Sequence, residues 1–197
     1  MLAKRNVNFY LSIDKQWGLV LSSEVVTRSA ERWFPVGVSQ LFEAYRDRDQ
    51  MLRWFGPANL TRWLKFDHDL RSGGELTFGF ADSDGQEFWG RCDFIDVDPG
   101  RRIEYISSIT DRSGAVIHPL PRCDWFLRVH TLVSMISSDL GTILRVTVSP
   151  HEADDREQAF FAFKWTEMKT RFDMSFNILE ALLDRLTAPE RHQFGAQ

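Results

Sequence analysis

The sequence predicts an α+β fold in which a curved antiparallel β-sheet wraps around one long C-terminal α-helix, with two short helices after the first strand. The first observation behind this prediction is the alternation of apolar and polar residues in consecutive segments of the middle of the chain, separated by turn residues. The second is a change of the apolar period after Pro150, where apolar residues recur every three or four positions. Consecutive strands without intervening helices favour an antiparallel meander.

The N-terminal part of the predicted domain contains one strand and two short helices. The strand covers Glu24 to Trp33, which is moderately rich in strand-forming residues. After Pro35 the spacing becomes helical, and the apolar residues that recur there are Val38, Leu41, Phe42 and Tyr45. A second helix is predicted from Gln50 to Phe55, because Gly56 and Pro57 together stop a helix.

Five further strands are predicted in the middle of the chain. They are Leu76 to Phe80, Glu87 to Val97, Ile103 to Ile109, Trp125 to Ile136 and Thr142 to Ser149. The segment from Asp111 to Arg122 contains Pro119 and Pro121, which favour a long loop between two of these strands.

The C-terminal helix carries a broad aromatic stripe. The stripe residues are Phe161, Trp165, Met168, Phe172, Phe176, Leu179, Leu183 and Leu186. About 30 residues at about 1.5 Å per residue give a rod of roughly 45 Å, which is long enough to cross a whole domain. Bulky aromatic residues and the lack of a sustained charged seam favour packing into the concave face of a sheet over a coiled coil.

Composition and charge exclude several functional classes. The formal charge of −4 argues against a nucleic-acid-binding protein with a broad basic surface. The two cysteines, Cys92 and Cys123, are too few for a disulfide scaffold or a zinc module. No apolar run reaches the roughly 20 residues of a transmembrane helix, and no signal peptide is evident, so a cytoplasmic protein is expected.

Several short motifs occur in a recognisable order. They are Trp54 to Pro57 (WFGP), Arg71 to Gly74 (RSGG) before a strand, Gly90 within the next strand, Val97 to Gly100 (VDPG) before Ile103, and Gly141-Thr142 at the start of a late strand. Together they resemble the family of the activator of heat-shock-protein-90 ATPase, in the START/SRPBCC superfamily. The resemblance implies the helix-grip fold, a curved sheet that holds a long C-terminal helix.

The resemblance also suggests the domain boundaries. It covers residues 24–187, which we interpret as one helix-grip domain, with residues 1–23 as an N-terminal extension (an extra strand or an arm) and residues 188–197 as a C-terminal tail. Proteins of this family often have a Gly-Trp pair in the long helix. Here Lys164 precedes Trp165, which questions a close approach of helix and sheet at that point.

The candidate binding residues are mostly aromatic. We expect a ligand cavity between sheet and helix to be lined by Trp54, Trp63, Phe78, Phe80, Trp89, Tyr105, His130, Trp165 and Phe172. Tyr105, His130 or Arg128 would supply a polar anchor. The alternative is a filled core, which the same aromatic residues would also form.

No catalytic or metal-binding signature is complete. His68 lies between Asp67 and Asp69, but neighbouring residues of a strand point to opposite faces and do not converge on a metal. Cys92 shares a strand face with Gly90 and Phe94 and is expected to be a buried thiol that borders any cavity. The sequence therefore predicts no catalytic residue, no metal and no cofactor.

Three functional hypotheses remain from the sequence. The leading one is a binding protein that holds a small apolar or amphipathic molecule between the sheet and the C-terminal helix. The alternative, which the resemblance implies, is a chaperone-associated protein-interaction module. The third is a cyclase or hydrolase, which would need a histidine or aspartate that faces the cavity. Nucleic acid is not an expected partner, and whether the chain forms a homodimer stays open.

Overall fold

A computed structural model describes residues 25–56, 60–117 and 128–187 and confirms the predicted fold class. The elements are β1 (Arg28–Phe34), α1 (Val38–Arg46), α2 (Arg48–Trp54), β2 (Leu60–His68), β3 (Glu75–Asp82), β4 (Glu87–Asp98), β5 (Arg102–Thr110), β6 (Arg128–Ser138), β7 (Gly141–Pro150) and α3 (Asp155–Thr187). The predicted extension and tail, and the start of the strand predicted from Trp125, lie outside the described residues.

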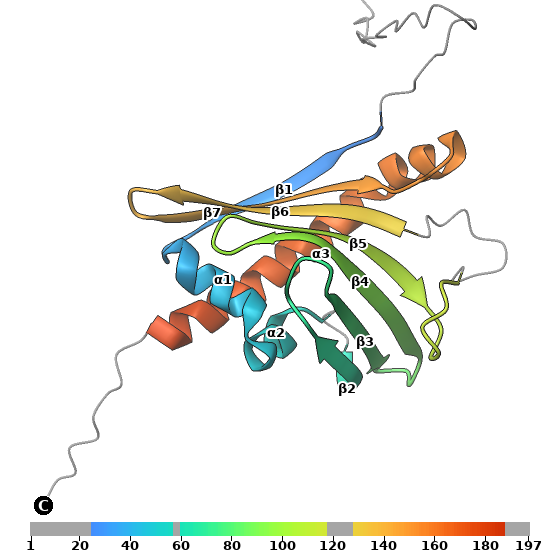
Figure 1. The fold of residues 1–197 in the computed structure, drawn as a ribbon, viewed down its shortest axis with the longest axis horizontal. Coiled ribbons are helices and arrows are strands. Elements are labelled where there is room, and N and C mark those ends of the chain that lie inside the picture. The colour runs from blue at the N-terminus through green and yellow to red at the C-terminus, as the bar shows by residue number, and fades with distance from the viewer. Residues whose placement is uncertain (1–24, 57–59, 118–127, 188–197) are drawn as a thin grey trace, which may run out of the picture.

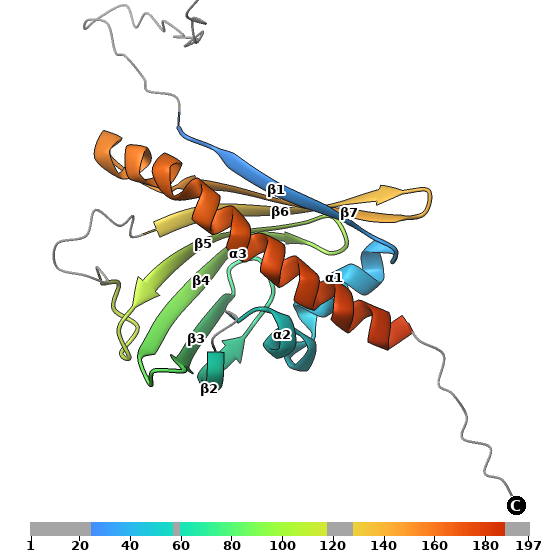
Figure 2. The same cartoon turned by 180° about the vertical axis from the view of Figure 1, so that it is seen from behind.

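The seven strands form one antiparallel sheet in the order β1-β7-β6-β5-β4-β3-β2. The sheet curves, and α3 crosses its concave side as a long rod (Figures 1 and 2). Strands β2 to β7 pair in the order in which they follow one another along the chain, so the predicted meander is confirmed. Strand β1 lies at the edge of the sheet and pairs with β7.

Strand β2 has no counterpart among the predicted strands. Its pairing with β3 contains register shifts between Leu60 and Arg62 and between Trp63 and Lys65. These irregularities place Trp63 and Phe66 together, with ring centroids 4.9 Å apart, although the two residues are an odd number of positions apart. Because an irregular strand loses the period of two, its sequence does not show the expected alternation.

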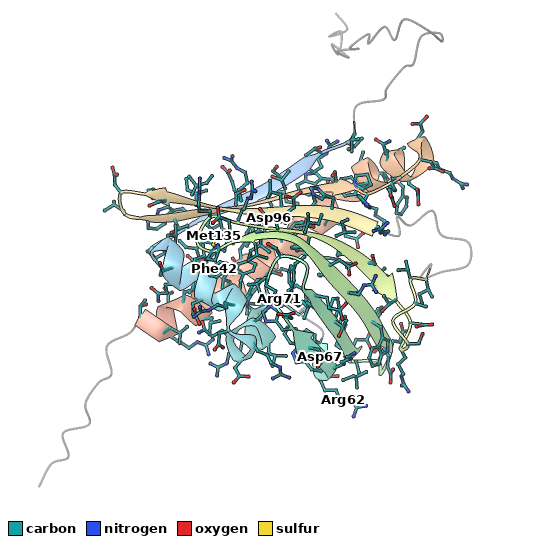
Figure 3. All side chains as sticks on the ribbon, viewed as in Figure 1. Phe42, Arg62, Asp67, Arg71, Asp96 and Met135 are labelled. Carbon is teal, nitrogen blue, oxygen red and sulfur yellow. The ribbon has the colours of Figure 1, made fainter. Side chains whose placement is uncertain are left out.

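Helices α1 and α2 close one end of the concave side. The Asp47 side chain caps α2 by accepting a hydrogen bond of 2.8 Å from the backbone N–H of Gln50. Trp54 Nε1 donates a bond of 2.9 Å to the carbonyl oxygen of Ala44, which ties the two helices together. Phe42 of α1 and Met135 of β6 both belong to the buried core at this end (Figure 3).

Helix α3 begins with a reciprocal cap. The backbone N–H of Glu157 donates to Asp154 Oδ1 at 2.8 Å, and the backbone N–H of Asp154 donates to Glu157 Oε2 at 3.0 Å. The predicted stripe faces the core, but unevenly. Phe161 and Phe176 are 0% and 3% exposed, whereas Trp165 and Phe172 between them are only partly buried.

The described residues contain neither a membrane-spanning helix nor a cluster of metal-ligating side chains. No helix among them is long and apolar enough to cross a membrane. In the same part of the chain, no group of three or more His, Cys, Asp or Glu side chains is placed to hold a metal ion.

Candidate functional site

An apolar cavity of about 150 Å³ lies between the sheet, the short helices and α3. Its walls come from α1, α2, the β2–β3 connection, strands β3 to β7 and the middle of α3. The lining residues are Tyr45, Met51, Trp54, Phe55, Leu70, Leu76, Cys92, Phe94, Ile103, Tyr105, Val133, Val146, Phe172, Ser175 and Phe176. Most of them are apolar, as in a typical small-molecule site.

A larger groove of about 620 Å³ adjoins this cavity and opens towards solvent. It runs between α3 and the inner face of β2, β3 and β4, and its walls are Phe55, Gly56, Trp63, Phe78, Phe80, Phe88, Arg171, Met174, Ser175 and Ile178. Phe55 and Ser175 line both spaces, so the cavity and the groove share a boundary at these two residues.

The position of α3 explains why this space stays open. The helix packs against β1 and β7 on one side and against α1 and α2 at the far end. Strands β2 to β4 splay away from it (Figure 2). The side chains that these strands direct towards α3 include Trp63, Phe78 and Phe80, and even these large rings leave the groove partly unfilled.

The titratable groups in the cavity wall are held in their neutral forms. Burial raises the pKa of the Cys92 thiol to about 12. Burial likewise raises the pKa values of the Tyr45 and Tyr105 hydroxyls, and the nearby Tyr105 adds to the effect on Tyr45. A hydrogen bond with Thr131 partly offsets the rise in the pKa of Tyr105. At neutral pH the wall therefore offers hydroxyl and thiol groups and no ionised group of its own.

His68 is a partly buried polar residue beside the cavity. Its ring lies 6.1 Å from that of Phe66 and 6.2 Å from that of Phe94, between centroids. Burial lowers the pKa of His68, with Asp69 opposing and Arg48 adding to this effect. Within the described part of the chain, Nε2 of His68 is buried without a hydrogen-bond partner. The residue is not among the walls of the cavity or the groove.

Six of the nine residues predicted to bind a ligand line the cavity or the groove. Trp54, Tyr105 and Phe172 line the cavity, and Trp63, Phe78 and Phe80 line the groove. Trp165 is adjacent but forms neither wall. It packs against Phe172 with ring centroids 6.4 Å apart.

Trp89 and His130 do not join these residues, because both face the outer side of the sheet. Trp89 covers Gly79 there, lies under the guanidinium of Arg112 at 5.7 Å and donates a hydrogen bond to Glu87. His130 Nε2 lies 2.7 Å from Glu104 Oε1. The alternation of faces along a strand could have placed Trp89 on the outer side. Gly90 lies beneath the inward-facing Phe78, so its neighbour Trp89 must point to the opposite face.

Several wall residues were not selected from the sequence. Phe88 shares the inner face of β4 with Gly90 and Cys92, so alternation was the available signal. Ser175 lies on the aromatic stripe of α3 between Phe172 and Phe176, and only its polarity concealed it. Tyr45 and Met51 carry no such signal, because their contribution depends on how α1 and α2 fold over the end of the sheet.

The residue types that line the cavity and the groove are relevant to the cyclase or hydrolase hypothesis. Among the described residues, neither the cavity nor the groove is lined by a histidine, aspartate or glutamate. The cavity-facing histidine or aspartate that the cyclase or hydrolase hypothesis requires is therefore not among these described wall residues.

Comparison with solved structures shows the same fold in bacterial proteins of low sequence identity. A solution structure of a protein from Arthrobacter aurescens is 20% identical with a TM-score of 0.67, and the match covers 87% of this chain and 94% of the other. A protein from Staphylococcus epidermidis is 17% identical with a TM-score of 0.65, and the match covers 87% and 97%. A crystal structure from Mycobacterium smegmatis gives 20% identity, a TM-score of 0.63 and coverages of 84% and 93%.

Comparison at the level of sequence gives a family. No curated protein matches the chain. A family model described as "Activator of Hsp90 ATPase homolog 1-like protein" matches residues 35–182, which span the elements from α1 to most of α3 and all the residues that line the cavity and the groove. The chain belongs to the Activator of Hsp90 ATPase homolog 1-like family.

Proposed function

We propose that the protein binds a small apolar or amphipathic molecule in the cavity and the adjoining groove. The observation that carries this proposal is an apolar cavity that meets an open groove at Phe55 and Ser175. A ligand can enter from solvent along the groove and place its apolar end in the cavity. A filled core would leave neither space.

The expected affinity comes mainly from apolar surface. Moving about 100 Å² of apolar ligand surface out of water contributes about 2–3 kcal/mol, at roughly 25 cal/mol per Å². A ligand that fills both spaces buries several times this area, and part of the gain offsets the loss of its translational and rotational freedom. We therefore expect a ligand that fills both spaces to bind with micromolar affinity without any ion pair.

Titration with a panel of apolar and amphipathic molecules tests the proposal. Binding should change the tryptophan fluorescence, since Trp54 lines the cavity and Trp63 the groove, and it should raise the melting temperature. A Ser175→Phe variant should block the junction and abolish both responses. Ala181→Phe, on the exposed side of the same helix, is the matched control. A flat response of the wild-type protein to the whole panel would contradict the proposal.

A second candidate function is association with a molecular chaperone. The family description names an activator of the Hsp90 ATPase. The observation that favours it is Phe163, which is 79% exposed on α3. If this function holds, the protein stimulates the ATPase of an Hsp90-type chaperone, and Phe163→Asp abolishes the stimulation while Thr166→Asp does not. Unchanged ATPase rates with the wild-type protein would rule this candidate out.

A further inference from the structure

The cavity contains a group of neutral polar side chains at its inner end. Tyr45 comes from α1 and Tyr105 from β5, and both are among the residues that line the cavity. Tyr105 is paired in register with Thr131 of β6, which is 3% exposed. Hydroxyls both donate and accept hydrogen bonds, so this group can bind an uncharged oxygen of a ligand.

The size of the cavity limits what can reach these hydroxyls. A dry cavity of about 150 Å³ in another protein accommodates one benzene molecule. The cavity described here has the same volume of about 150 Å³, so it holds one six-membered ring. Any further part of the ligand must pass Phe55 and Ser175 and lie in the groove.

Charge excludes a second class of ligand from the inner end. No charged side chain is among the described residues that line the cavity. Burying an ionised carboxylate there would cost several kcal/mol with no opposite charge to offset it. In the groove, the charged wall residue is Arg171, whose Nη2 is already 2.7 Å from Glu167 Oε1.

We propose that the ligand is a neutral ring compound of the phenol or cyclic-ketone class, with its ring in the cavity, its oxygen hydrogen-bonded to the Tyr45 and Tyr105 hydroxyls, and an apolar substituent in the groove. This inference rests on the proposed function, because it specifies the ligand of the same site. It separates this ligand class from fatty acids and other amphipathic anions.

Three probes that share a butyl-substituted benzene ring and differ in the para substituent test the ligand class: 4-butylphenol, butylbenzene and 4-butylbenzoate. Their affinities are measured at pH 7 by tryptophan fluorescence and by calorimetry. We expect 4-butylphenol to bind about ten-fold more tightly than butylbenzene, which is the effect of one net hydrogen bond. The benzoate should bind at least about a hundred-fold more weakly than the phenol, because its charge must be buried.

Two conservative variants assign the effect to the hydroxyls. Tyr45→Phe and Tyr105→Phe keep both rings, including the 4.7 Å edge contact of Tyr45 with Trp54, and melting temperatures verify that they fold. Each should weaken 4-butylphenol binding by about ten-fold and change butylbenzene binding far less.

The outcomes separate the inference from the proposed function. Equal affinities for 4-butylphenol and butylbenzene, or tightest binding of the benzoate, would overturn the inferred ligand class and leave the binding function standing. Equal losses for phenol and benzene in both tyrosine variants would also overturn it. If none of the three probes binds and the wider panel is also flat, the proposed function itself fails.

Discussion

The two halves of the interior differ in how completely aromatic side chains fill them. In the half between α3, β1 and β7, Phe34, Leu144 and Phe161 are all 0% exposed. In the half that faces β2 to β4, Phe88 is 45% exposed, and Phe78 and Phe80 are partly exposed beside the groove. Both halves use the same residue types. Helix α3 packs directly on β1 and β7, and this placement, rather than the hydrophobicity of the side chains, distinguishes the filled half from the half that contains the groove.

The largest expected effect comes from truncating one phenylalanine in each half. Phe34→Ala removes a fully buried ring that lies 6.2 Å from the Phe176 ring, and it should lower the free energy of unfolding by about 3–5 kcal/mol. Phe88→Ala should cost about 1 kcal/mol or less, since nearly half of that side chain is already in water. Urea unfolding measures both. Equal losses would show that the two halves are packed alike.

The next effect concerns a glycine beneath the groove. A Cβ added at Gly90 would lie 2.5 Å from the ring of Phe78, so Gly90→Ala should displace that ring and destabilise the fold by about 1–3 kcal/mol. It should also alter ligand binding, because Phe78 lines the groove. Gly37→Ala is the control, with no atom within 4 Å of the added Cβ. A neutral Gly90→Ala would mean that Phe78 moves freely into the open half.

Alkaline pH should produce a smaller effect on the inner wall. The pKa of Cys92 is raised to about 12 in the folded protein, so its contribution to stability is complete below the unfolded pKa and is lost as pH rises towards about 12. At pH 9.5 the loss from this thiol should be about 1 kcal/mol. Cys92→Ala should remove this loss in urea unfolding curves recorded at pH 7 and 9.5. If the free energy of unfolding of the wild-type protein and of Cys92→Ala depended on pH in the same way, the Cys92 thiol would not be in a buried site.

Thiol reactivity gives an independent measure of the same wall. In a Cys123→Ser background, Cys92 should react with iodoacetamide much more slowly at pH 8 than a free thiol does, because little thiolate forms. A ligand in the cavity should slow the reaction further. Modification at the rate of an unfolded control would contradict the enclosed position of this residue.

The smallest effects are expected on the outer face of the sheet. His130→Ala breaks a partly buried contact with Glu104 and should change the free energy of unfolding by less than about 1 kcal/mol. Ligand affinity should stay unchanged, because His130 and the groove lie on opposite faces of the sheet. A fluorescence titration of this variant checks the assignment of faces, and a loss of affinity would reverse it.

Most of the fold was predictable because its signals are local. The period of two in β3 to β7, the stops at Gly56 and Pro57 and the long stripe of α3 each depend on nearby residues alone. Strand β2 was missed because its irregular pairing removes the alternation. The site was only partly predictable. Alternation could have excluded Trp89 and included Phe88, but no local pattern shows that Tyr45 of α1 and Tyr105 of β5 line the same cavity.

The sequence by itself determined the α+β class, the order of the elements other than β2 and the alternation of faces in the regular strands, because backbone periodicity follows from local geometry. Only the tertiary structure decided which residues of the aromatic stripe of α3 pack against other side chains and which line an open space. Helix α3 packs closely on β1 and β7 and leaves β2 to β4 splayed, so Phe161 is fully buried core while Phe172, eleven residues later, lines a cavity. That difference arises from the curvature of the whole sheet, which no single segment encodes.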